Sequence, residues 1–141
     1  MRAELIFLPV LLQILLTLGI YVRLGQVKEQ AVRRGEVNQQ RRALHEDAWP
    51  VEVLKVNNNI RNQFETPVLF YVLVICLWLL DGVGIAALLA AFAYVILRLG
   101  HAWVHLGTNV VRVRKRLFQA SIITLFFLCG LTLFALLQGS R

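Results

Sequence analysis

The chain has 141 residues, of which 58% are hydrophobic, with a mean hydropathy of +0.66 and a formal net charge of +7. Soluble domains average roughly 45–50% apolar residues, so this composition excludes an ordinary soluble domain and predicts an integral membrane protein. The positive charge does not indicate a nucleic-acid partner, because 12 of the 15 basic residues fall in or beside two segments that separate apolar stretches.

Four apolar stretches predict an all-α, integral membrane four-helix bundle that forms a single domain over residues 1–141. A membrane-spanning helix needs about 20 mostly apolar residues. We therefore expect helices at about 5–24, 62–80, 82–105 and 117–137. The first stretch is too long for the core of a signal peptide and no small-residue cleavage site follows it, so we interpret it as a retained helix.

The first helix carries one polar residue, Gln13, which we expect to form a hydrogen bond with another helix. The polar stretch Val27–Arg42 contains no proline and only one glycine, and it is expected to extend this helix beyond the membrane.

The distribution of basic residues predicts the topology. Eight of them flank or fill the first loop, Arg23–Arg61, and four form the third, Arg112–Arg116. Basic loops remain on the cytoplasmic side. Both loops should therefore lie inside, and the short Asp81–Gly82 connection and both termini should lie outside, as in a multi-pass membrane protein.

Two charged residues are predicted to share one depth of the membrane. The apolar runs 66–80 and 82–97 are too short to span it, so their helices must include Glu65 and Arg98. Glu65 lies 16 residues before Asp81, and Arg98 lies 16 residues after Gly82. A charge inside a bilayer costs at least ~2.5 kcal/mol, so we expect the two to interact directly or through a bridging water or ligand.

The same counting places Asn62 level with His101 and Asn58 level with His105. Asn58, Asn62 and Glu65 share one face of a helix at spacings i, i+4 and i+7. The alternative is that one of the three consecutive asparagines, 57 to 59, is simply the N-cap of the second helix.

A polar stripe marks the end of the third helix. Its spacings of 3, 4, 4 and 3 put all members on one helix face, which should contact protein or a polar cavity rather than lipid. The stripe predicts that the helix continues past the membrane surface, and it consists of Arg98, His101, His105, Asn109 and Arg112.

These residues suit an anion site best, because they offer many donors and few acidic groups. Arginine binds carboxylates through a planar fork, so the ligand would be a small amphiphile with carboxylates. The site residues are Arg98, Arg112, His101, His105, Asn58 and Asn62. In the alternative, Arg98 only pairs with Glu65 and the histidines only pack.

Metal and proton-transfer sites are less well supported. His101 and His105 at i, i+4 could share an ion with Glu65, but a di-iron centre needs many more ligands, so we predict no metal site. The outer halves of the helices contain almost no ionisable residue that could relay a proton. Cys76 and Cys129 lie in apolar helices and are interpreted as small packing residues.

Two stretches of the chain resemble the membrane-associated proteins in eicosanoid and glutathione metabolism (the MAPEG family), as in a bacterial-type member. RNQFETPVLFY, Arg61–Tyr71, resembles the family's asparagine-x-x-glutamate motif, which is followed by a proline. RLGHAWVH, Arg98–His105, resembles its third-helix motif, and Arg112 follows at the spacing of a family arginine.

The resemblance implies a homotrimer that binds glutathione between subunits. It implies glutathione contacts at Asn62, Glu65 and Arg98, and makes Arg112 the residue that stabilises the thiolate, as in leukotriene C synthase. His101 and His105 stand where that enzyme has tyrosines, as does Thr66, and Asn58 replaces an arginine.

The function implied is a glutathione-dependent transferase or peroxidase that acts on lipophilic electrophiles in the membrane. The missing tyrosines favour an alternative, a non-enzymatic membrane protein of the same fold that binds a lipid or a partner protein. The retained arginine spacing favours the enzyme.

Overall fold

A computed structural model describes residues 2–139, and within this range the chain forms helices and loops without any strand. Four helical stretches are long and apolar enough to cross a membrane, with α2 and α3 together forming the second. The predicted all-α membrane fold is therefore confirmed. The elements are η1 (Ala3–Ile6), α1 (Phe7–Arg33), η2 (Glu46–Ala48), α2 (Val51–Gln63), α3 (Thr66–Leu79), α4 (Ile85–Leu106) and α5 (Val111–Gly139).

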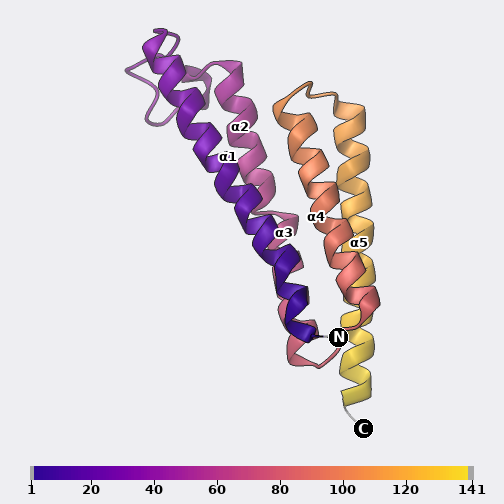
Figure 1. Ribbon diagram of the computed structural model, residues 1–141. Coiled ribbons are helices and arrows are strands. Elements are labelled where there is room, and N and C mark those ends of the chain that lie inside the picture. Colours follow the sequence, from indigo (N-terminus) through magenta and orange to yellow (C-terminus); the bar gives the residue numbers. More distant parts are fainter. Residues whose placement is uncertain (1, 140–141) are drawn as a thin grey trace.

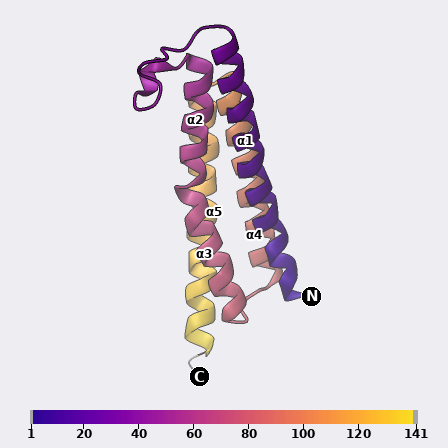
Figure 2. The same cartoon turned by 90° about the vertical axis from the view of Figure 1, so that its left-hand side faces the viewer.

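The helices form two pairs, in which α1 lies beside α2 and α3, and α4 lies beside α5 (Figures 1 and 2). The connections α1–α2 and α4–α5 lie at one end of the molecule, and the α3–α4 connection lies at the other (Figure 1). Both basic segments therefore belong to the same end, which we call the basic end.

The helices extend further than their apolar stretches, because polar residues outside the hydrocarbon can continue a helix while their side chains meet water. α1 ends at Arg33, well short of the expected Arg42. Gly35 causes this early end, since its φ of +69° and the bond from the Glu36 amide to the Ala31 carbonyl close the helix.

The second span begins at Val51, directly after Pro50, and not near Asn62 as predicted. The three consecutive asparagines lie inside α2, which rules out the alternative that one of them is the N-cap of the second helix. Trp49–Pro50 provided the start signal, because proline favours the position just before or at the first helical turn.

The third helix does not reach Arg112, and this part of the stripe prediction is wrong. α4 ends at Leu106, and Asn109 adopts a left-handed conformation, with φ of 51°. The Asn109 amide donates to the Val104 carbonyl at 2.7 Å, which closes the turn. Asparagine tolerates this conformation better than most residues, and Arg112 consequently lies in the first turn of α5.

The connection between α3 and α4 is longer than the two residues predicted, since it runs from Leu80 to Gly84. Asp81 has a φ of 52°. A Cβ at Gly82 would come within 2.6 Å of the Ala135 Cβ, so the absence of a side chain lets this turn approach α5 closely.

Two buried clusters hold the bundle together. The first, which we call the apolar core, contains Phe70, Val74, Leu77, Ala91, Tyr94 and Leu128. The second joins α1, α2 and α4 to the α1–α2 loop through residues such as Val27, Val53 and Ile60. Many apolar side chains point outward instead; Phe126 is 74% exposed, as expected where helices face lipid.

Candidate functional site

A break in the second span creates the site. Pro67 has no amide hydrogen and its ring crowds the carbonyl of Gln63, so the helix is interrupted between α2 and α3. Glu65 lies in this break and is exposed. The Asn62 carbonyl falls in the last turn of α2, where carbonyls lack helical partners, and it accepts a hydrogen bond from Arg98 Nη2 at 2.5 Å.

Arg98 is completely buried, and it extends from α4 toward this break. Its Nε and Nη1 atoms have no hydrogen-bond partner within residues 2–139. Its guanidinium carbon lies 5.9 Å from the centre of the Phe118 ring. A buried guanidinium with two unpartnered nitrogens leaves donors available to an anion.

No direct Glu65–Arg98 ion pair exists among the described residues, so the direct form of that prediction is wrong. The reason is the break, which turns Glu65 outward while Arg98 reaches the Asn62 carbonyl instead. The bridged form of the prediction is not tested.

The two histidines are buried beside Arg98, with ring centres 5.8 Å apart. His101 Nδ1 lies 3.1 Å from the Arg114 carbonyl. Because a carbonyl only accepts, Nδ1 must carry the proton, and the unpartnered Nε2 of His101 is then free to accept. His105 Nδ1 lies 3.4 Å from the Asn62 amide nitrogen, a long contact in which the amide donates.

The predicted levels of the asparagines are wrong by about one turn. Asn62 contacts His105 and not His101, and Asn58 is exposed. Asn59 faces α4 in its place, and its amide donates to the Ala102 carbonyl at 3.2 Å. Counting from the α3–α4 turn assumed an unbroken helix, and the interruption at Glu65 rotates α2 relative to α3.

A buried amide network, which sequence reasoning largely missed, adjoins the site. Gln63 Nε2 donates to Asn59 Oδ1 at 2.9 Å, and Gln13 Nε2 donates to Gln63 Oε1 at 2.9 Å. The predicted interhelical bond of Gln13 is thereby confirmed. The signal for the other two was present, since Asn59 and Gln63 recur at i, i+4 on the face of α2 that carries Val56 and Ile60. We call the buried polar residues Gln13, Asn59, Gln63, Arg98, His101 and His105 the polar layer.

An open cavity of about 290 Å³ lies where the break, α4 and the start of α5 meet. Arg114 and Lys115 line it, and Arg114 Nη1 is held by Asn109 Oδ1 at 2.8 Å. Phe118 lines it too and is the residue that contacts both Arg98 and His101. The remaining lining residues are Asn62, Glu65, His101 and Val111.

The structure thus gathers most of the predicted site but not all of it. Asn62, Glu65 and His101 line the cavity, and Arg98 and His105 lie directly behind these residues. Asn58 and Arg112 are exposed and do not line it. The arginine of this chain that lines the cavity is Arg114 and not Arg112. The sequence did not show this, because it did not reveal that α4 ends at Leu106 and that both arginines belong to α5.

The arrangement is suited to binding an anion. Arg114 and Lys115 line the cavity and Arg98 is buried behind it, whereas Glu65 is the one carboxylate among the lining residues. The positive end of the α5 helix dipole adds to the positive potential there. Among residues 2–139 no three side chains of histidine, cysteine, aspartate or glutamate lie together as metal ligands. The site is therefore a pocket with an excess of positive charge at the basic end of the bundle, and its donors are of the kind that can hold a carboxylate.

The comparisons with known proteins agree with this architecture. The model of the MAPEG family matches residues 6–134, which is nearly the whole chain and includes every residue of the site. No curated protein and no solved structure matches the chain.

Proposed function

This chain belongs to the MAPEG family, and from that premise we propose that it is a membrane-embedded, glutathione-dependent transferase or peroxidase acting on lipophilic electrophiles. The family is associated with glutathione use, and four membrane helices make the protein integral to a bilayer. The observation that carries the proposal is Arg98, a fully buried guanidinium that has, within residues 2–139, two unpartnered nitrogens and no carboxylate within 4.0 Å.

The chain's polar groups fit the tripeptide. Glutathione carries two carboxylates, an amine and two peptide groups, and it supplies the nucleophilic thiol. Arg98 would hold a carboxylate through Nε and Nη1, and the Asn62 side chain would bind a peptide group. Glu65 would hold the amine, since it is the one carboxylate that lines the cavity and it has no ion pair within the described chain.

The remaining cavity residues would orient and enclose the peptide. His101 Nε2 would accept a hydrogen bond, and Arg114 and Lys115 would attract the second carboxylate from the open side. His105 and Asn58 stay predicted contacts, the first behind Asn62 and the second on the exposed face of α2.

Arg112 is proposed to stabilise the thiolate on a neighbouring subunit of a homotrimer. Its side chain is exposed in the first turn of α5 and does not line the cavity of its own chain. It can therefore serve such a ligand only across a subunit boundary. A positive charge beside a thiol favours the thiolate, which is the reactive form.

The experiment is isothermal titration of the purified protein with glutathione, combined with turnover of a chromogenic aryl halide. We expect Arg112→Ala to keep the assembly and most of the binding, and to lower turnover about 100- to 1000-fold. It should also remove the ultraviolet absorbance of the bound thiolate. Arg116→Ala, an exposed arginine one turn further along α5, is the matched control and should change neither.

Two other outcomes have a clear meaning. Unchanged turnover in Arg112→Ala, with the assembly intact, would mean that Arg112 serves only as one of the basic residues that set the orientation in the membrane. Absence of any glutathione binding by the wild-type protein would favour the alternative, a non-enzymatic protein that binds a lipid or a partner through the same fold.

We propose that the basic end faces the cytoplasm of a bacterial inner membrane and that both termini lie outside. In a background without Cys76 and Cys129, Arg33→Cys should resist a membrane-impermeant thiol reagent in intact cells, and Asp81→Cys should be labelled. Labelling of the first and protection of the second would invert the topology.

A further inference from the structure

A second cavity, unrelated to the candidate glutathione site, lies between the α1–α2 loop and the two helices that it connects. Its volume is about 230 Å³. Three of its lining residues are basic by type, namely Lys28, Arg42 and His45, and Trp49 supplies an aromatic wall. Glu46 and Asn57 complete its polar lining.

The loop holds these groups in place. Lys28 Nζ lies 5.1 Å from the centre of the Trp49 ring, and Trp49 Nε1 donates to the Arg42 carbonyl at 3.2 Å. Two of the loop's apolar side chains, Val37 and Ala48, are buried against the bundle. Trp49 therefore holds both the Lys28 side chain and the backbone of Arg42 at the cavity.

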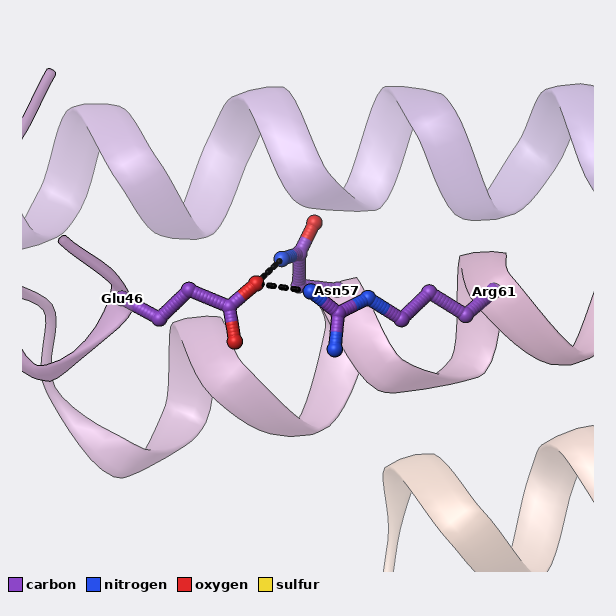
Figure 3. A network of polar contacts seen from close by, with 3 residues as sticks. All are labelled: Glu46, Asn57 and Arg61. Atoms are coloured by element: carbon purple, nitrogen blue, oxygen red, sulfur yellow. Dashed lines mark hydrogen bonds and ion pairs between the residues drawn. The ribbon is translucent and has the colours of Figure 1, made fainter. Parts of the chain in front are cut away.

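The acidic residues beside the cavity are already paired. Glu46 accepts a hydrogen bond from Asn57 and forms an ion pair with Arg61, as Figure 3 shows. Asp47 pairs with Arg41 at 3.0 Å. Neither Lys28 nor Arg42 takes part in a salt bridge within residues 2–139. The cavity thus offers two uncompensated positive charges to an incoming anion.

A count along α1 places the cavity at the depth of lipid headgroups. Lys28 comes four residues after Leu24, the end of the apolar stretch of α1, which is about 6 Å along the helix. Asn57 lines the same cavity from α2, which packs against α1. The headgroup layer occupies about 5–8 Å on each side.

We propose that this cavity binds the phosphate of an anionic phospholipid in the leaflet at the basic end. Lys28 and Arg42 pair with the phosphate, and Trp49 takes the position that aromatic side chains prefer at the membrane interface. Leu44, which is 89% exposed at the rim, provides an apolar contact for the lipid. The proposal is independent of glutathione use.

The test uses Trp49 as its own reporter in the full-length protein, with Trp78 and Trp103 changed to phenylalanine. Short-chain phosphatidylglycerol, kept below its micellar concentration, is titrated against the detergent-solubilised protein. Phosphatidylcholine of the same chain length, glycerol phosphate and inorganic phosphate are the comparison ligands. We expect saturable quenching or enhancement of Trp49 fluorescence with phosphatidylglycerol alone.

Charge variants decide whether the cavity is responsible. Lys28→Gln with Arg42→Gln should weaken phosphatidylglycerol binding about 30-fold. The control, Arg33→Gln with Arg34→Gln, removes the same charge from exposed positions outside this cavity and should change binding less than about threefold. If the double cavity variant does not fold, Lys28→Gln alone should weaken binding about fivefold.

Three results would overturn the proposal. Equal losses in the cavity and control variants would mean diffuse attraction to basic loops. Binding of phosphatidylcholine as tight as that of phosphatidylglycerol would show that the cavity does not recognise the negative charge of the lipid. Binding of inorganic phosphate or glycerol phosphate as tight as that of the lipid would assign the cavity to a soluble phosphate compound.

Discussion

The polar layer lies on α1, α2 and α4, whereas the apolar core lies on α3, α4 and α5, and the two regions satisfy their buried polar atoms differently. In the apolar core the buried hydroxyl of Tyr94 donates to Thr66 Oγ1 at 3.1 Å, and its ring stacks on Phe70 with centres 4.5 Å apart. In the polar layer four buried atoms have no partner in the described chain, and they belong to Gln13, Arg98 and His101.

This difference separates a region whose buried hydroxyl is paired from one whose unpaired atoms support the ligand site proposed above. Leaving a buried donor or acceptor unpaired costs about 1–3 kcal/mol, and more for a charged group. A chain needing only stability would fill the polar layer with leucine and phenylalanine, as it does a few turns away. His101 lines the cavity and Arg98 lies behind Asn62, which also lines it, so a ligand that reached both side chains would offset their desolvation.

The largest effect is expected in the apolar core. Phe70→Ala removes a fully buried ring that stacks on Tyr94, and it should lower the free energy of unfolding by about 3–5 kcal/mol. Thermal and denaturant unfolding of the reconstituted protein measure this. Ile96→Ala, at a position 64% exposed toward lipid, is the control and should cost less than about 1 kcal/mol. Similar losses in both would show that Phe70 is not part of a packed core.

Arg98→Leu should have the second-largest effect, and it should weaken ligand binding and not stability. Glutathione binding should weaken about 100-fold, because a charged hydrogen-bonding group is removed, while the unfolding midpoint should stay the same or rise. Titration calorimetry and a melting curve of the same sample give both values. A strong fall in the midpoint with unchanged binding would assign Arg98 to structure and contradict its role as a ligand group.

The smallest effect is expected in the amide network. Gln63→Leu leaves the side chains of Gln13 and Asn59 without their partner and should destabilise the protein by about 1–3 kcal/mol. Adding Gln13→Leu removes one of these orphaned groups and should recover part of the loss. If the second change adds a further full penalty, the two glutamines do not form the bond that joins α1 to α2.

The membrane class and the number of spans could be predicted from sequence, and so could the closeness of Asn62, Glu65, Arg98 and His101. Hydrocarbon thickness fixes the length of an apolar helix, and a charge at that depth needs a function. The partners of these residues were harder to predict. The pairing of Asn62 with His105 depends on the helix break at Glu65, whose rotation is not encoded by counting residues.

What the sequence determined by itself is therefore the membrane spans and most of the polar residues that gather near one end of them, because hydropathy and helical rise act locally along one chain. Only the tertiary structure decided which of them meet. The turn at Asn109 ends α4 and brings Arg114 to the cavity in place of Arg112, and the break before Pro67 exposes the carbonyl that Arg98 binds. Both depend on how helices rotate and pack against each other, which is settled by contacts between residues that are distant in the sequence.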